Sequence, residues 1–460
     1  MSNRFSLKNI VHKLAVKNPR RLSVYVGLCL GAVILALAAL IFMFGGDIIN
    51  GYVKGKVERA FDIAHPGSAL RIGKLDYAVG TNCLVAQSVI LNTRNSTFKS
   101  GRISVTGVRW LRLLWGTPVI SDILYKARLD ATNLDMKFLK SHYGIRSERL
   151  WASVPDSELV AEGNVLSALI EDEKIFASSA FRTTRFRVVV PEFKVSGLAY
   201  SEMLKGKSYR ARSVQFYRPS FDALVNRDKP VAPFVKSPLM VNEALSAIRQ
   251  PVQIDNISIT DGYIRYCERV VVGADPGVLT FTAVNMSVEG IANRGKSPSS
   301  ILLKAQCNIM DAGVLKVLMT IPVASPDFSF HYSGSLSAMD LTRLDAFLEI
   351  AEHLRIKSGS VKELAYEIDV TAGHASGHVR AIYKDLNITV LDKKTGTEKG
   401  LDNRVASFLV NTFKIKNSKV REVSSATGEG KVNYARRPED EFMQFVWFAL
   451  RSGVLDVIKF

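Results

Sequence analysis

Hydrophobic and polar residues alternate along most of the chain with a period of two, the pattern of β-strands that bury one face. The alternation is clearest between residues 252 and 395. There, apolar runs enter and leave glycine-containing segments at Asp261–Gly262, Asp311–Gly313 and Ser358–Gly359. We interpret each segment as a hairpin turn, so this region should form an antiparallel meander with one apolar face and one polar face.

The apolar positions of this meander should line one face of a sheet. The expected lining consists of Ile257, Ile259, Ile264, Leu303, Val317, Met319, Leu364, Tyr366, Ile368, Val379 and Ile388. Such a long meander closes into a barrel, folds as a sandwich or curls around a helix or a ligand, and the pattern leaves these alternatives open. It also leaves open whether the apolar face is a groove or a sealed core.

The same alternation covers residues 69–138 and 185–217, which we also expect to form strands. Residues 147–180 are less regular, and the helix-like stretch Glu158–Lys174 favours a helical or mobile insertion. The expected fold class is therefore mainly β: an elongated, curved antiparallel sheet, as a groove or an open barrel, with a few embedded and C-terminal helices.

Several short segments have the spacing of amphipathic helices. They are residues 50–64, 238–249, 341–354, 401–414 and 442–460. Asp340 is the expected N-cap of the third helix, because an aspartate there accepts hydrogen bonds from the first turn.

The last of these helices has one apolar stripe and two aromatic residues outside it. The stripe consists of Phe442, Phe445, Val446, Ala449 and Leu450. We expect Phe445 and Leu450 to face the sheet, and Trp447 and Phe448 to contact a membrane or another subunit. The alternative is a simple lid over the apolar face.

Val24–Phe44 is an uncharged apolar run, long enough as a helix to cross a bilayer. Residues 1–23 carry six basic residues and no acidic one. Since positive flanks stay in the cytoplasm, we expect a single-pass inner-membrane protein with its bulk in the periplasm. The expected regions are a basic tail (1–23), a transmembrane helix (24–44), a β-rich region (45–235), a meander region (236–400) and C-terminal amphipathic helices (401–460).

The formal charge of +18 suits anionic lipid headgroups, although it also serves solubility. Nucleic acid is not expected as a partner, because the predicted topology places the bulk of the chain outside the cytoplasm. Gly290–Ser297 matches a phosphate-binding loop, but Pro298 and a predicted strand follow where a helix is required, so we expect no nucleotide. Cys267 and Cys307 would pair only if their strands were neighbours, and free thiols are favoured.

No motif indicates an enzyme. His374 and His378 have a metal-ligand spacing that suits a helix, but they lie in a predicted hairpin, which favours surface histidines. We therefore expect no catalytic residues, no metal and no cofactor. An active site assembled from scattered residues is left open.

Several stretches resemble the AsmA-like family of bacterial envelope proteins. They are Leu70–Leu75, Ile103–Phe138, Ile254–Tyr266 and the segment from His353 to the C-terminus, which includes Gly400–Phe408. The resemblance implies an inner-membrane anchor and a periplasmic β-rich groove, related in plan to TamB and the larger bridge-like lipid-transfer proteins. It also implies a role in phospholipid transport or outer-membrane biogenesis, and it carries no catalytic residues.

Together these features predict a non-enzymatic, membrane-anchored protein whose apolar sheet face holds phospholipid acyl chains. The alternative is a periplasmic scaffold that binds envelope proteins through its sheet edge and C-terminal helices. An open apolar trough would favour lipid, and a face covered along its whole length would favour the scaffold.

Overall fold

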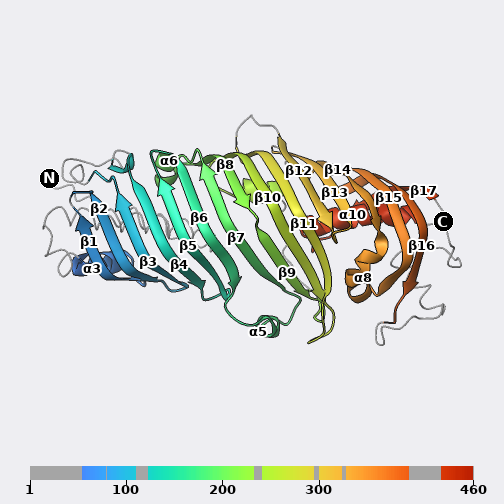
Figure 1. Ribbon diagram of the computed structural model, residues 1–460, viewed down its shortest axis with the longest axis horizontal. Coiled ribbons are helices and arrows are strands. Elements are labelled where there is room, and N and C mark those ends of the chain that lie inside the picture. The colour runs from blue at the N-terminus through green and yellow to red at the C-terminus, as the bar shows by residue number, and fades with distance from the viewer. Residues whose placement is uncertain are drawn as a thin grey trace. The chain divides into compact units, whose positions relative to one another are not determined.

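The computed structural model describes residues 54–78, 80–109, 123–232, 241–294, 300–323, 328–392 and 426–458. The fold is mainly β, with seventeen strands assigned to one sheet and several short helices (Figure 1). The predicted membrane span at Val24–Phe44 and the predicted helix at 401–414 lie outside the described residues. Within the described ranges, no helix has the length and apolarity to cross a bilayer.

The chain divides into two compact units. Unit 1 comprises the described residues up to Leu169 together with Lys194–Lys207, and unit 2 comprises Ile170–Phe193 and the chain from Ser208 onward. Strand β7 (Thr184–Ser196) contributes residues to both units. The expected boundary at residues 235–236 falls inside unit 2.

Unit 1 is built on six strands, each antiparallel to the next. They are β1 (Ala69–Ala78), β2 (Cys83–Asn92), β3 (Ser96–Thr106), β4 (Arg128–Phe138), β5 (Tyr143–Ser153) and β6 (Glu158–Ala168). Helix α3 (Lys54–Ala64) buries Val57 and Phe61 in the same core as Leu75 and Ile103. The helix expected at 50–64 is therefore confirmed over its described part. The described part of the unit also contains helix α6 (Tyr200–Leu204).

The expected helical or mobile insertion at 147–180 is wrong for most of its length. Glu158–Ala168 is a strand paired along its length with β5, and only α5 (Asp172–Ala177) is helical. Gly163 has a positive φ of 60°, yet the pairing with β5 keeps the same register on both sides of it. The strand is therefore continuous, and its apolar spacing alone did not distinguish it from a helix.

Unit 2 contains most of β7 and ten further strands. They are β8 (Tyr209–Tyr217), β9 (Ser220–Asn226), β10 (Val252–Arg269), β11 (Gly277–Ala292), β12 (Ser300–Ile309), β13 (Gly313–Pro322), β14 (Phe330–Asp340), β15 (Leu354–Thr371), β16 (His374–Val390) and β17 (Ala426–Ala435). From β10 to β17 each strand is antiparallel to the next, which confirms the expected meander. At its other edge, β10 runs parallel to both β8 and β9.

Two of the three expected turns are bulges inside continuous strands. Asp261–Gly262 lies within β10 and Ser358–Gly359 within β15, and both positions coincide with shifts of register. Asp261 has a φ of 54°, as bulged residues often do. The bulge keeps Ile259 and Ile264 on the same face, so the sequence pattern looks like that of two strands. The turn at Asp311–Gly313 is confirmed between β12 and β13.

The helices of unit 2 connect or cover its strands. Among the described residues, the helices besides α5 are α7 (Val241–Ser246), the 3₁₀ turn η5 (Leu341–Leu344), α8 (Asp345–Ala351) and α10 (Phe442–Val457). The N-cap prediction is confirmed, because Asp340 accepts a hydrogen bond from the Thr342 amide at 2.9 Å. The expected helix at 341–354 ends earlier, and Leu354 already begins β15.

Candidate functional site

The predicted lining residues lie in cross-strand rows on one face of unit 2. Since directly paired residues share a face, the register alone establishes this. One row runs Ile257, Val288, Leu303, Met319, Tyr332 and Ile368. The next runs Ile259, Met286, Ala305, Val317, Gly334, Tyr366 and Val379. Ile264 continues this face beyond the bulge of β10, opposite Phe281. Sequence alternation thus identified residues that the fold brings together.

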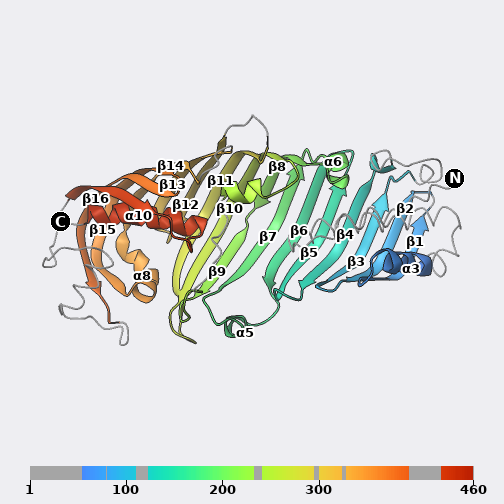
Figure 2. The same ribbon diagram turned by 180° about the vertical axis from the view of Figure 1, so that it is seen from behind.

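Helix α10 seals the part of this face that is nearest the C-terminus (Figure 2). Its Phe445 and Ala449 are fully buried, in one cluster with Tyr332, Ile368 and Val379. The helix approaches closely because Gly453 meets the sheet without a side chain; a Cβ atom there would lie 2.5 Å from Val379 Cγ2. Here the apolar face is a sealed core rather than an open groove.

Beside this sealed core lies a cavity of about 170 Å³. Two predicted residues, Leu364 and Ile388, line it. The other lining residues come from β14, η5, β15, β16 and the end of α10: Leu336, Leu341, Leu344, Ile356, Val361, Ala381, Tyr383, Leu386, Val454, Val457 and Ile458. The cavity is partly open to the surface, and its exposed lining is apolar, so an apolar guest would displace water that finds no hydrogen-bond partner there.

Farther from α10 the same face is partly exposed. Ile257, Ile259, Ile264 and Leu303 are all half-buried. Helix α7 covers one end of this area, where Val241 and Leu245 pack against the same apolar cluster as Val288 and Ile291. The face is therefore neither open along its whole length nor uniformly covered by the helices of the described chain.

Two tyrosines on the sheet show how thoroughly this site excludes water. The Tyr332 hydroxyl donates to the Val446 carbonyl of α10 at 3.1 Å. The Tyr383 hydroxyl is buried and has no hydrogen-bond partner among the described residues. Burial raises the pKa of both phenols, and it raises the pKa of Tyr366 to about 12. These groups stay neutral at physiological pH and offer no general base.

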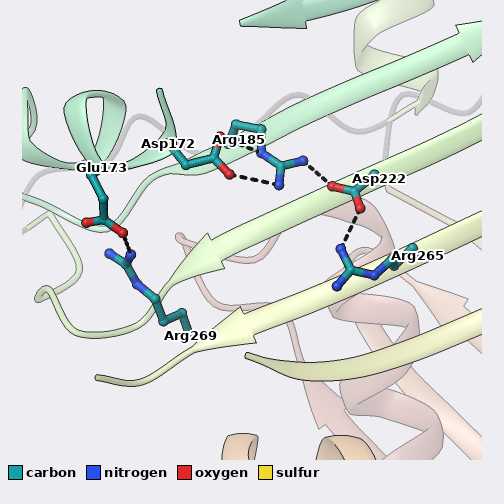
Figure 3. Close-up of polar contacts among 6 residues, drawn as sticks. All are labelled: Asp172, Glu173, Arg185, Asp222, Arg265 and Arg269. Carbon is teal, nitrogen blue, oxygen red and sulfur yellow. Dashed lines mark hydrogen bonds and ion pairs between the residues drawn. The ribbon is translucent and has the colours of Figure 1, made fainter. Parts of the chain in front are cut away.

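The opposite face of unit 2 carries a chain of ion pairs (Figure 3). Arg185, 12% exposed, lies between Asp172 of α5, at 3.0 Å, and Asp222 of β9. Asp222 in turn accepts from Arg265 of β10 at 2.8 Å. Burial alone would raise the pKa of Asp222, but hydrogen bonds from Arg265 and Arg185 outweigh it and lower the pKa.

A second pair holds the same short helix. Arg269 is buried, pairs with Glu173 of α5 and lies over the Phe176 ring, 4.7 Å from its centroid. Lys229 donates to the carbonyl oxygens of Phe176 and Ser179. Because each of these arginines has an acidic partner, we interpret this network as a clamp that fixes α5 on the polar face rather than as a catalytic site.

The two aromatic residues singled out on α10 differ in exposure. Trp447 is 51% exposed, whereas Phe448 is half-buried and packs its ring at 5.8 Å against Tyr434 of β17. Phe448 therefore faces the sheet in part, contrary to the expectation that both would point away. Met443, one turn before Trp447, is 71% exposed and was missed. Membrane or partner contact at Trp447 stays a prediction.

The other chemical candidates have ordinary surroundings. His374 and His378 lie on strand β16 and are exposed, as expected of surface histidines. Cys267 and Cys307 are free thiols on β10 and β12, which are separated by β11. In the described part of the chain, no group of three or more His, Cys, Asp or Glu side chains is placed to hold a metal ion.

Sequence reasoning missed the ion pairs of unit 2 and most of the cavity lining. Glu173 and Arg269 are far apart in the chain, and no local pattern links them. Val454, Val457 and Ile458 line the cavity from α10, where the apolar spacing alone was a usable signal. No family model matches this chain, and no curated protein matches it either.

Proposed function

We propose that this chain is a non-enzymatic, inner-membrane-anchored envelope protein whose unit 2 holds the acyl chains of membrane lipids. The observation that carries the proposal is the cavity, whose whole lining is apolar and which lies on the same sheet face as the half-exposed Ile257 and Ile259. Burying one methylene group contributes about 0.8 kcal/mol, so each carbon of an acyl chain that enters the cavity adds to binding.

The headgroup of such a lipid would stay outside the cavity, because the exposed lining is apolar and the hydroxyl of the lining residue Tyr383 is buried. Arg343 is exposed and precedes the lining residue Leu344 in sequence. Its guanidinium group would meet the headgroup phosphate at the surface. The resemblance to the AsmA-like family agrees with this function. We propose the family membership and the membrane anchor at Val24–Phe44 together with it.

Lipid analysis of matched variants tests the proposal. Ala381 lines the cavity, while Ala365 lies on the neighbouring strand β15 with its side chain exposed. The full chain, purified in mild detergent, should release bound lipid that mass spectrometry detects. Ala381→Leu fills the cavity and should reduce the lipid bound per chain at least severalfold, whereas Ala365→Leu should leave it unchanged. A wild-type chain free of lipid, or equal lipid in both variants, would refute the proposal.

Exposed Met443 and Trp447 favour a second candidate function, a scaffold that binds an envelope protein through α10. They are four residues apart and so lie on one helical face. Replacing both by serine should leave the melting temperature nearly unchanged and abolish recovery of the partner after crosslinking in cells. Replacing Phe445 and Leu450 by serine should instead lower the melting temperature strongly, because Phe445 is fully buried and Leu450 packs on the same cluster.

A further inference from the structure

Helix α10 contacts the edge of β17 through two polar side chains. The Lys431 amide donates to Asp456 Oδ2 at 2.9 Å, and the Asn433 amide donates to Ser452 Oγ at 3.2 Å. These two amides therefore do not bond to β16, although β17 pairs with β16 along its length. The two amides point to the edge of β17 that faces away from β16, where side chains of α10 accept their hydrogen bonds.

Helix α3 has the same arrangement on β1 in unit 1. The Leu70 amide donates to Asp62 Oδ1 at 3.1 Å, and the Ile72 amide donates to Glu58 Oε1 at 2.7 Å. Lys54 adds the complementary contact, since its ammonium group donates to the Gly73 carbonyl at 3.0 Å. Helix α3 therefore engages two amide donors and one carbonyl acceptor of β1.

The two contacts share one geometry. In each, acceptors four residues apart on a helix reach amides two residues apart on a strand, and the helix and strand run in opposite directions. One helical turn rises about 5.4 Å and two strand residues span about 6.6 Å, so the two spacings nearly match. Apolar packing alone would not place acceptors on alternate amides.

Edge amides without partners are a template for another strand, and natural sheets block them by covering the edge. We infer that α3 and α10 are edge guards that prevent a second copy of this chain from adding to the sheet through β1 or β17. The second copy is the relevant competitor because it carries the same strands with complementary bonding groups. This inference does not depend on the binding of lipid.

The symmetry of possible contacts makes the inference specific. Release of β17 alone allows two copies to pair through the same edge, a closed dimer that offers no further β17 edge. Release of β1 as well allows β17 of one copy to meet β1 of the next, an open-ended assembly. The number of guards removed should therefore determine whether association stops at two chains.

The first test removes the acceptors from α10. Ser452→Val with Asp456→Leu leaves Lys431 and Asn433 without their side-chain partners. The matched control on the same helix is Gln444→Val with Glu441→Leu, which removes one amide and one carboxylate; Glu441 makes no cap hydrogen bond. In sedimentation of the full chain in mild detergent, the variant should shift from one chain to two as concentration rises. The control should sediment as the wild type does.

A suppressor distinguishes strand pairing from unfolding. Proline has no amide hydrogen and is tolerated on an edge, so Asn433→Pro should block strand addition. Added to the α10 variant, it should restore the single chain, although it restores no contact with α10. Glu58→Leu with Asp62→Leu, combined with the α10 variant, should give species larger than two chains. A variant that stays a single chain, or association that proline increases, would overturn the inference.

Discussion

Asp222 illustrates how a partly buried carboxylate is kept charged on the polar face of unit 2. It receives hydrogen bonds from Arg185 and Arg265, which come from two neighbouring strands of the sheet. Burial favours the neutral acid, but the two guanidinium groups prevail and the pKa falls below its ordinary value of 3.8. The carboxylate therefore stabilises the folded state, and its contribution depends on pH in a known direction.

Asp222→Asn should reduce the loss of stability in acid. Because the folded pKa lies below 3.8, the contribution of Asp222 is fully present above that pH and is lost as the pH falls through the folded pKa. The unfolding free energy of the wild type, measured in urea, should drop more between pH 6 and pH 3 than that of the variant. Equal drops would show that the ion pairs contribute nothing measurable.

Helix α10 shows how much of an element was predictable. Its apolar stripe was readable, and Phe445 is buried as expected. The close contact at Gly453 could not be predicted from the sequence, because a glycine in a helical pattern indicates only a low local helix propensity. The bulges at Asp261 and Ser358 were misread for a related reason: a glycine within alternating residues indicates a turn or a bulge equally well.

Gly453→Ala should lower stability although alanine is the better helix former. The added Cβ atom would lie 2.5 Å from Val379 Cγ2 and 2.7 Å from Val432 Cγ2. Overpacking costs about 1–3 kcal/mol, whereas the gain in helix propensity is about 1 kcal/mol. The melting temperature should fall, while Gln444→Ala, on the exposed side of the same helix, should leave it unchanged. A raised melting temperature for Gly453→Ala would mean that α10 does not pack this closely.

At the scale of the whole molecule, the sequence predicted a mainly β chain and the residues that share one face of unit 2. Period-two alternation suffices for this, because it records which side chains point the same way. It did not predict which part of the face a helix covers. The cavity depends on the packing of α10 against β16 and β17. Strand β16 is far from α10 in sequence, and β17 is separated from it by a short connection. Burial of that kind leaves no local pattern.

The predicted anchor gives a topology experiment for the whole chain. With the basic residues 1–23 in the cytoplasm and Val24–Phe44 crossing the membrane, a reporter fused after Phe460 should be active only if it works outside the cytoplasm. Alkaline phosphatase at this position should be active and a green fluorescent protein dark. The converse pattern would place the C-terminus in the cytoplasm and would refute the envelope location in the proposed function.

Photocrosslinking with a fatty acid that carries a diazirine near its methyl end tests the central claim most directly. After illumination of the full chain, peptide mapping should place the label on the cavity walls, at Leu341, Val361 or Val454. Excess unlabelled fatty acid should compete it away, and Ala381→Leu should reduce labelling severalfold while Ala365→Leu does not. Label confined to the exposed residues Met443 and Trp447, or labelling that Ala381→Leu leaves intact, would contradict a hydrocarbon site in unit 2.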